Sequence, residues 1–248
     1  MAEVKKLSVI IAGAGNSTRL GIEYSKQFVM LLGKPLLCYS IEKFLHLKNV
    51  FEIIVVTNDI DQTQKVLTPY KSVKNVEIKT VLGGELRQES VYRGFSSLSA
   101  SCNLVLIHDV ARPLFDLDDV KKCIEEAALC GSAVLAVPVS DTIKKAEYNE
   151  DKLIVKNTLD RNGLYLIQTP QVYSYDLLAW MYEEYKKLKD KQKIATDEAC
   201  VLEGLGKSIN LVIGKRKNIK ITYKEDLEIA VGILGEEEKM KEGLCLKQ

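Results

Sequence analysis

The sequence predicts an α/β protein with a Rossmann-like, doubly wound and mostly parallel sheet. Strand-like apolar runs alternate with amphipathic helical runs along nearly all of the 248 residues. These apolar runs are rich in Val and Ile and almost continuous in hydrophobicity, as in strands covered on both faces. No repeat or linker divides the chain. We therefore expect a single domain over residues 1–248, with a β-hairpin arm that protrudes from it.

The elements follow from these patterns in chain order. The expected strands are Leu7–Ala12, Phe51–Thr57, Val76–Leu82, Leu104–His108, Ala133–Val139 and Ile209–Ile213. The expected helices are Leu36–Leu47, Gln88–Leu98, Asp116–Leu129, Tyr175–Lys189, Asp197–Leu205 and Lys224–Leu234. Asp116 is the expected N-cap of its helix, and Gly131 is its expected stop. Because ligands in such sheets bind beyond the carboxyl ends of the strands, the loops at those ends should converge on a site.

The arm is the one departure from the alternation, over residues 141–160. Thr142–Tyr148 and Leu153–Thr158 are expected to pair as a hairpin around a polar turn. A two-stranded ribbon is only marginally stable alone in water, which favours packing on a second subunit. A flap that closes on its own site is the alternative.

The composition limits the classes of partner. Lys plus Arg number 35 against 34 Asp plus Glu, so no global field indicates a nucleic-acid or membrane partner. No apolar run has the length of a transmembrane helix, and the N-terminus leads straight into a strand. The six scattered cysteines, with no C-x-x-C pair, indicate free thiols in a cytoplasmic protein. With two histidines in the chain, a His-based metal site or triad is disfavoured, and His108 reads as a packed residue rather than a base.

The small-residue loop Gly13–Gly21 directly follows the first strand. Such a loop exposes backbone N–H groups to which phosphates can come close. Two cations follow, Arg19 and Lys26, seven positions apart. We therefore predict a polyphosphate site with chemistry at the phosphates.

Several explanations compete for this loop. A P-loop would need Gly-Lys-Ser/Thr, which is absent from the chain. A dinucleotide-binding turn would need a glycine at Thr18 and an acidic residue about 20 positions on, whereas the next strand ends only near Asp59. The nucleotidyltransferase loop A-x-G-x-G-x-R-M-G, followed by P-K-Q, fits better, and an ordinary turn with surface charges is the remaining reading. The departures from that pattern are Ser17 for Gly, Leu20 for Met and Ser25 for Pro.

Further polar groups follow at later strand ends. In Gly83–Ser90, Gly84 can lie against a flat base and the Ser90 hydroxyl can bond to it. Asp109 suits a ribose hydroxyl or a phosphate-bound Mg²⁺, and Arg112 could bind an anionic substrate.

Four more candidates lie in the second half of the chain. Arg161 is a plausible phosphate fork, and Thr169 offers a hydroxyl. Thr196 is the expected cap of the helix that follows it. Lys220 is expected on a short strand among Ile residues. Because the other candidate residues suit phosphate binding, we expect Lys220 to line the pocket rather than to point into solvent.

Taken in order, these motifs resemble the 2-C-methyl-D-erythritol 4-phosphate cytidylyltransferases. The matching segments are Gly13–Gly21 with Lys26-Gln27, Gly83–Ser90, His108–Pro113, Asp141-Thr142, Asp160–Leu164 with Gln168–Gln171, Thr196–Glu198 and Asn218–Thr222. The resemblance implies transfer of CMP from CTP to methylerythritol 4-phosphate, a small phosphorylated polyol, with Mg²⁺ and release of pyrophosphate. It also implies a homodimer whose arms reach into each other's sites.

The resemblance assigns roles by position. It implies that Arg19 and Lys26 stabilise the α-phosphate in the transition state, and that Arg161 and Lys220 place the attacking phosphate. The implied CTP-binding residues are Ala12, Gly13, Ala14, Gly15, Gly84, Glu85, Ser90 and Asp109. The implied acceptor-binding residues are Arg112, Thr142, Arg161, Thr169, Thr196 and Lys220. Mg²⁺ would be held mainly by the CTP phosphates, with Asp109 as a candidate ligand. Three departures bear on this assignment, Ser17, Ser25 and Glu85, the last standing where some members carry Asp.

The implied chemistry agrees with the composition. An ionised attacking phosphate needs no general base, and preorganised cations can neutralise the charge that develops. The nearest rival is a ribitol 5-phosphate cytidylyltransferase, which shares the glycine loop and Gln168–Gln171. More distant rivals are a sugar-1-phosphate nucleotidyltransferase, a dehydrogenase and a non-catalytic nucleotide-binding module. A binding module would not need to keep all four of the cations Arg19, Lys26, Arg161 and Lys220.

Overall fold

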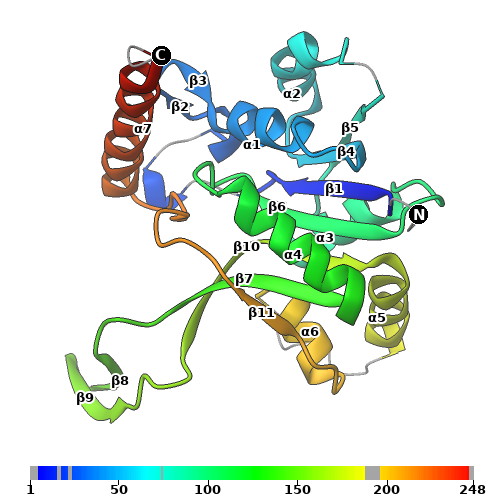
Figure 1. The fold of residues 1–248 in the computed structure, drawn as a ribbon. Coiled ribbons are helices and arrows are strands. Elements are labelled where there is room, and N and C mark those ends of the chain that lie inside the picture. Colours follow the sequence, from blue (N-terminus) through cyan, green and yellow to red (C-terminus); the bar gives the residue numbers. More distant parts are fainter. Residues whose placement is uncertain (1–4, 16–17, 22–23, 74, 188–195, 246–248) are drawn as a thin grey trace.

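A seven-stranded sheet forms the centre of the computed structural model (Figure 1). The structure describes residues 5–15, 18–21, 24–73, 75–187 and 196–245. The strand order is β11-β7-β10-β6-β1-β4-β5, and every neighbouring pair is parallel except the two that involve β10. The predicted doubly wound, mostly parallel α/β class is therefore confirmed.

The bounds of the elements are as follows. The strands are β1 Leu7–Ala12, β2 Met30–Leu31, β3 Lys34–Pro35, β4 Val50–Thr57, β5 Glu77–Leu82, β6 Leu104–Asp109, β7 Ser132–Pro138, β8 Ile143–Asn149, β9 Lys152–Leu159, β10 Tyr165–Ser174 and β11 Asn210–Ile213. The α-helices are α1 Leu36–Leu45, α2 Ile60–Leu67, α3 Arg87–Ser96, α4 Leu117–Cys130, α5 Tyr175–Lys187, α6 Glu198–Gly204 and α7 Lys224–Cys245.

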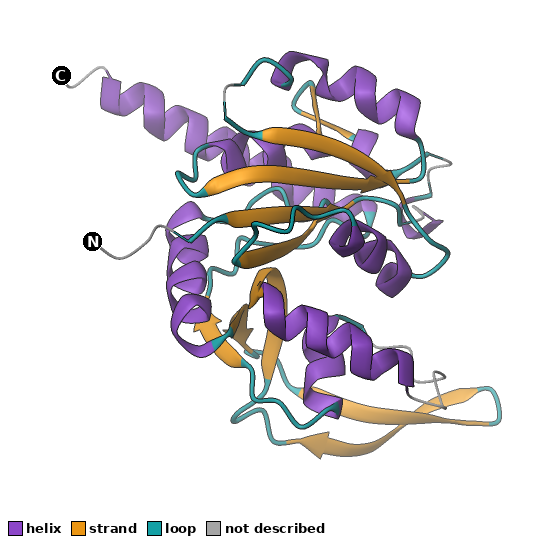
Figure 2. Cartoon of the chain, turned by 90° about the vertical axis from the view of Figure 1, so that its right-hand side faces the viewer, coloured by secondary structure: helices purple, strands orange, loops and turns teal. Residues whose placement is uncertain are grey.

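Helices cover both faces of the sheet (Figure 2). Helices α1, α2 and α4 pack on one face, and α3, α5 and α6 pack on the other. In β1, Ile10 faces the α3 side and Ile11 faces the α1 side, and neither is exposed. Burial on both sides explains why the strands read as unbroken apolar runs.

Helix α4 begins and ends where its sequence predicts. The Asp116 carboxylate accepts a hydrogen bond from the N–H of Asp118 at 3.0 Å. Gly131 follows the last turn with φ +88°, a conformation that glycine adopts without strain. Its N–H donates to the Ala127 carbonyl at 2.9 Å, which closes the helix.

Strand β10 was not expected, because the segment around Pro170 read only as a motif. It lies antiparallel between β6 and β7. Proline cannot donate to a ladder, so it normally argues against a central strand. Here the pairing with β7 is interrupted between Ile167 and Gln171, and this gap accommodates Pro170.

The predicted arm is present as the β8–β9 hairpin. It leaves the sheet after β7 and extends away from the rest of the chain (Figure 1). Apart from half-buried Ile143, its residues are exposed, including Tyr148 at 76% and Leu153 at 63%. The other predicted elements mostly match their ranges, although α7 extends further than predicted. Helix α2 and the short β2–β3 pair were not predicted.

Two expectations about composition can be compared with the structure. Within the described ranges, no helix is long and apolar enough to cross a membrane. Five cysteines have free thiols: Cys38, Cys102, Cys123, Cys130 and Cys200.

Candidate active site

The carboxyl ends of β1, β4, β5 and β6 surround a cavity of about 440 Å³, which we call the nucleotide cavity. Parallel strands end at the same edge of a sheet, so the loops after them meet there. Every residue that the resemblance assigned to CTP lines it: Ala12, Gly13, Ala14, Gly15, Gly84, Glu85, Ser90 and Asp109. Three of the four proposed catalytic cations line it too: Arg19, Lys26 and Lys220.

A backbone hydrogen bond holds the first glycine loop against strand β4 of the sheet. The N–H of Gly13 donates to the Val56 carbonyl of β4 at 2.8 Å. A Cβ at Gly13 would lie 2.5 Å from the amide oxygen of buried Gln27 and 3.0 Å from the Val56 carbonyl oxygen, so glycine fits here without displacing either group. Ser25, where the family pattern has proline, donates its hydroxyl to the Gly13 carbonyl at 3.0 Å and thereby holds the loop closed. Ser17, the other departure in this loop, lies outside the described residues.

The second glycine turn touches the first. A Cβ at Gly83 would overlap the Cβ of Ala14, so the two loops approach as closely as they do only because Gly83 has no side chain. The N–H of Gly84 donates to the Ser90 hydroxyl at 3.0 Å. Ser90 therefore shapes this turn as well as lining the cavity.

Lys26 is a buried cation inside the nucleotide cavity. Its side chain is held by a hydrogen bond from Nζ to the Ile221 carbonyl at 3.1 Å. Burial lowers the pKa of Lys26, and the charges of Arg19 and Lys220 lower it further. Three cations gathered around one cavity are favourably placed for an anion that binds among them.

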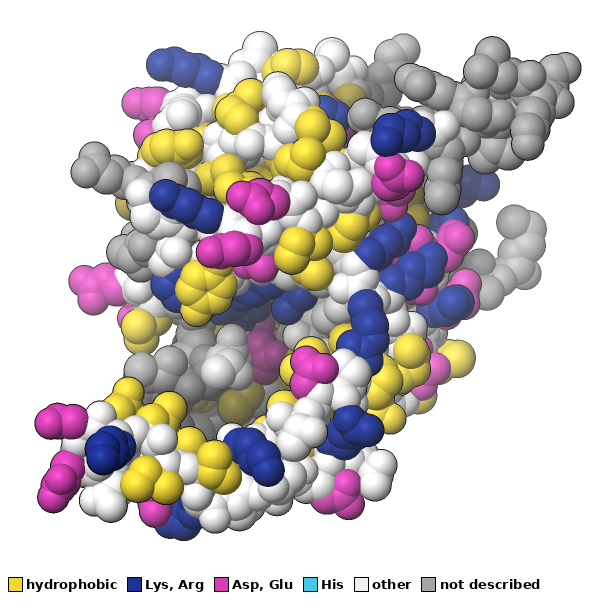
Figure 3. Space-filling model, turned by 90° about the vertical axis from the view of Figure 1, so that its left-hand side faces the viewer, with side chains coloured by type: hydrophobic (Ala, Val, Ile, Leu, Met, Phe, Trp, Pro, Cys, Tyr) yellow, Lys and Arg dark blue, Asp and Glu magenta, His cyan; other side chains and the backbone are white. Residues whose placement is uncertain are grey.

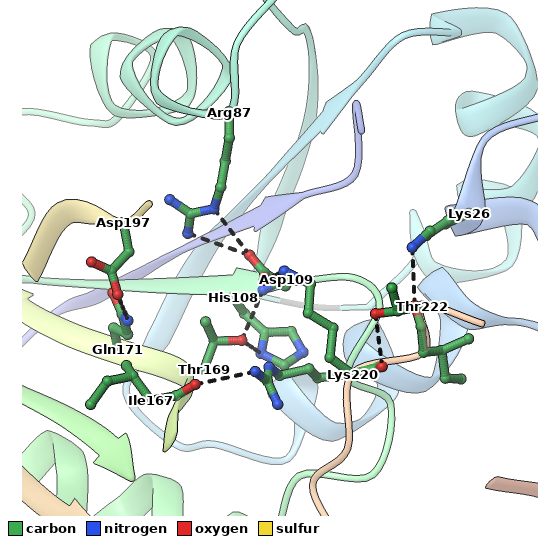
Figure 4. Close-up of polar contacts among 12 residues, drawn as sticks. Lys26, Arg87, His108, Asp109, Ile167, Thr169, Gln171, Asp197, Lys220 and Thr222 are labelled. Carbon is green, nitrogen blue, oxygen red and sulfur yellow. Dashed lines mark hydrogen bonds and ion pairs between the residues drawn. The ribbon is translucent and has the colours of Figure 1, made fainter. Parts of the chain in front are cut away.

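Asp109 lies at the end of β6, and each of its two carboxylate oxygens forms an ion pair with a cation (Figure 4). Lys220 Nζ lies 2.5 Å from Oδ2, and Arg87 contacts Oδ1 at 3.4 Å. Burial alone would raise the pKa of Asp109. The charges of Arg87 and Lys220 outweigh burial, however, and hold that pKa well below its usual range. Asp109 therefore remains a carboxylate.

Lys220 does not lie on a strand, contrary to the prediction. The segment from Asn218 to Thr222 is irregular, and the hydrogen bond from the Ile221 N–H to the Ala111 carbonyl at 2.8 Å is an isolated link rather than a ladder. Buried Ile221 anchors the segment in the core, so Lys220 points to Asp109.

His108 is a packed residue, as expected. Its ring is fully buried beside Phe44 and Phe115, and its Nδ1 lies 3.1 Å from the Thr169 hydroxyl. Burial lowers its pKa to about 3, so the imidazole is neutral near pH 7. Thr169 also accepts a hydrogen bond from the N–H of Asp109 at 3.0 Å, which ties β10 to the end of β6.

A smaller cavity of about 200 Å³, the acceptor cavity, adjoins the first. Arg112, Thr169, Thr196 and Lys220, all predicted to bind the acceptor, line it. Arg87, Asp109 and Lys220 line both cavities and form their shared wall. Figure 3 shows a hollow between the body and the arm, with Lys and Arg side chains at its upper edge.

Thr142 and Arg161 line neither cavity. Both are exposed at the root of the arm, and Arg161 donates a hydrogen bond to the Ser140 carbonyl. One chain therefore brings together four of the six residues predicted to bind the acceptor.

Thr196 is not the cap of α6, contrary to the prediction. Asp197 is the N-cap, and its carboxylate accepts a hydrogen bond from the Cys200 N–H at 2.9 Å and another from Gln171 Nε2 at 2.8 Å. Asp accepts hydrogen bonds from the first helical turn as well as Thr does, so the sequence alone could not separate the two neighbours. The Thr196 hydroxyl is thus not needed as a cap.

Arg87 is the functional side chain that the sequence reasoning missed. It lies within the Gly83–Ser90 motif, but its partners are Asp109 and Glu198, far along the chain. Asn58, at the end of β4, also lines the nucleotide cavity without having been predicted. No local pattern in the sequence indicates a role in the site for either Arg87 or Asn58.

The described residues contain no group of three or more His, Cys, Asp or Glu side chains that could hold a metal ion. Asp109 and Glu85 are the carboxylates on the nucleotide cavity wall. A divalent ion here would therefore take most of its oxygen ligands from a bound phosphate.

Comparison with known proteins gives one consistent result. A model of the 2-C-methyl-D-erythritol 4-phosphate cytidylyltransferase family matches residues 7–236. Relatives of that name in Alkaliphilus oremlandii and Caldanaerobacter subterraneus are 38% and 40% identical, over 94% and 90% of this chain and 97% and 96% of theirs. The crystal structure of 4-diphosphocytidyl-2C-methyl-D-erythritol synthase from Anaerococcus prevotii matches with a TM-score of 0.78 at 29% identity, covering 94% of this chain and 97% of that one. The crystal structure of 2-C-methyl-D-erythritol 4-phosphate cytidylyltransferase from Thermus thermophilus gives 0.72 at 29% identity, over 92% and 98%.

Proposed function

The chain belongs to the 2-C-methyl-D-erythritol 4-phosphate cytidylyltransferase family, and from this premise we propose how its own residues carry out the transfer. The enzyme transfers CMP from CTP to 2-C-methyl-D-erythritol 4-phosphate and releases pyrophosphate. One observation carries the assignment of residues. The cavity lined by all the predicted nucleotide residues shares Asp109 and Lys220 with the cavity lined by predicted acceptor residues.

CTP would bind along the two touching glycine loops. The backbone of Ala14 and Gly15 would face the triphosphate, while Gly84, Glu85 and Ser90 would receive the cytidine. The close contact between Gly83 and Ala14 fixes the distance between these two subsites.

The chemical step needs charge stabilisation rather than proton transfer. An oxygen of the acceptor phosphate attacks the α-phosphorus, a new P–O bond forms, and the bond to the β-phosphate breaks to release pyrophosphate. The nucleophile is already an anion, so neutral His108 has no proton to remove. Arg19 and Lys26 would neutralise the charge that grows on the α-phosphate, each contributing about 3 kcal/mol.

The acceptor would enter through the smaller cavity. Arg112, Thr169 and Thr196 line its wall, and Lys220 would hold the attacking phosphate. Thr142 and Arg161 would complete this pocket from the arm of a second subunit in a homodimer. The exposed apolar side chains of the arm and of the start of β10 support that assembly: Tyr148, Leu153, Ile154, Val155, Leu159, Tyr165, Leu166 and Ile167.

Mg²⁺ fits the donors that this cavity offers. The ion would be held mainly by the CTP phosphates, with Asp109 as the nearest candidate carboxylate once Lys220 moves to the acceptor. When bound, it supplies positive charge on the departing pyrophosphate. The five free thiols support the expected cytoplasmic location.

Pyrophosphate release tests this function directly. The purified protein is mixed with CTP and Mg²⁺ and with either 2-C-methyl-D-erythritol 4-phosphate or ribitol 5-phosphate. We expect release with the first acceptor. Release only with ribitol 5-phosphate would keep the mechanism but change the substrate, and no release with either would overturn the proposal.

A further inference from the structure

Arg87 occupies the wall between the two cavities and joins two carboxylates. It begins helix α3, and its guanidinium contacts Asp109 Oδ1 through Nε and one terminal nitrogen, each at 3.4 Å (Figure 4). The other terminal nitrogen contacts Glu198 Oε2 at 3.0 Å. Neither Arg87 nor Glu198 has a part in the reaction as described above.

Glu198 is a buried charge without contact with either cavity. Its side chain is 2% exposed in the first turn of α6. A buried carboxylate is costly unless it is paired, and Arg87 is its ion-pair partner. The pair therefore fixes the guanidinium from the side that faces away from the substrates.

Asp109 depends on this fixed guanidinium when the acceptor binds. In the structure Lys220 occupies its Oδ2 and Arg87 its Oδ1. The same Lys220 is assigned to the acceptor phosphate, so it must loosen its contact with Asp109 during the reaction. Arg87 then becomes the cation that keeps Asp109 charged and in place.

We propose that Arg87, fixed by Glu198, is a positioning residue that holds Asp109 and thereby frees Lys220 for the acceptor phosphate. This inference rests on the proposed function of the site. It explains why the residue is arginine: a planar guanidinium contacts two carboxylates at once, whereas a lysine ammonium is a single point of charge.

Conservative variants separate positioning from folding. In Arg87→Lys the charge stays but the bridge is lost, so kcat should fall by about 10- to 100-fold, while KM for CTP changes much less. Glu198→Gln keeps an acceptor for Arg87 and should show a smaller loss of the same kind. Glu203→Gln, on the exposed side of the same helix, is the matched control and should behave as wild type.

Lys220, Arg112 and His108, which also face Asp109, stay in place in these variants. Melting temperatures, measured alongside, identify any variant that is merely unfolded.

Chemical rescue gives a second readout. Arg87→Ala leaves a space that opens to both cavities, and millimolar guanidinium should restore part of kcat, whereas ammonium should not. Absence of wild-type turnover would overturn the proposed function and this inference together. Wild-type turnover with unchanged kcat in Arg87→Lys and Glu198→Gln, or a loss of kcat without rescue by guanidinium, would overturn the inference alone.

Discussion

The nucleotide cavity and the acceptor cavity share a wall but are assembled differently. The nucleotide cavity lies at the ends of parallel strands β1, β4, β5 and β6, and one chain supplies every residue predicted for CTP. The acceptor cavity lies beside antiparallel β10, and one chain leaves Thr142 and Arg161 outside it, at the root of the exposed arm.

The difference shows which kind of site a single chain can complete. Glycine loops bind phosphate with their own backbone, so a few consecutive residues after a strand are sufficient. The residues predicted to bind the acceptor come from separate segments. Two of them, Thr142 and Arg161, lie at the root of a two-stranded ribbon of a kind that is only marginally stable alone. We therefore expect changes in the nucleotide cavity to act within one subunit, and changes at the arm to act across subunits.

The largest effect is expected at Lys26. Lys26→Ala removes a buried cation from the nucleotide cavity, so kcat should fall by about 100- to 1000-fold while affinity for CTP falls modestly. Stopped-flow or steady-state pyrophosphate release measures kcat, and CTP titration measures the affinity. Lys121→Ala, which removes an exposed ion pair with Asp118 on α4, is the control. Wild-type turnover in Lys26→Ala would remove this residue from the mechanism.

The next effect is expected where the two glycine loops touch. Gly83→Ala places a methyl group on Ala14, which costs about 1–3 kcal/mol of overpacking and should weaken CTP binding about tenfold. Gly232→Ala on α7 meets open space and should leave CTP binding unchanged. CTP titration of both variants checks this. Equal affinities would mean that the loops can separate without loss.

A pH effect is expected at buried His108 of β6, whose Nδ1 lies 3.1 Å from the hydroxyl of Thr169 in the wall of the acceptor cavity. The unfolded chain takes up a proton near pH 6.5, whereas the buried imidazole does so only near pH 3. Acid therefore favours the unfolded state, and stability contributed by neutral His108 is lost as pH falls from 6.5 towards 3. Between pH 7 and 5, wild type should lose about 2 kcal/mol more than His108→Asn. Urea unfolding at both pH values measures this loss. An equal fall in the free energy of unfolding of the two proteins would contradict the prediction.

The smallest effects are expected at the start of α6, beside the acceptor cavity. Asp197→Ala removes the helix cap and should lower the free energy of unfolding by about 1 kcal/mol. Thr196→Val should change stability by less than about 0.5 kcal/mol but raise KM for the acceptor. Urea unfolding and acceptor titration measure the two effects. A large loss of stability in Thr196→Val would restore Thr196 as the cap.

The same contrast governs what the sequence could predict. Strands such as β1 and β4 are buried on both faces, so their composition is sufficient to identify them. Strand β10 escaped prediction because Pro170 argues against a strand, and only the interrupted pairing with β7 makes room for it. Helix α2 is short and polar, although Asp59 followed by Gln62 is a capping signal that could have revealed it.

The site divides in the same way. The loop residues of the nucleotide cavity were predictable, because their spacing along the chain is also their arrangement in space. The role of Arg87 was not, because it depends on Asp109 and Glu198, which are 22 and 111 positions away. Such partners meet only through tertiary packing.

Mixed dimers test the central claim that one chain completes the nucleotide cavity while its partner completes the acceptor cavity. Lys26→Ala and Arg161→Ala chains with different tags are co-expressed, and the hybrid that carries both tags is purified. If arms cross between subunits, the hybrid contains one intact site, built from the wild-type Lys26 of one chain and the wild-type Arg161 of the other. It should then show about half of the wild-type turnover per dimer, although each variant alone is nearly inactive. An inactive hybrid, or an active monomer, would contradict the account.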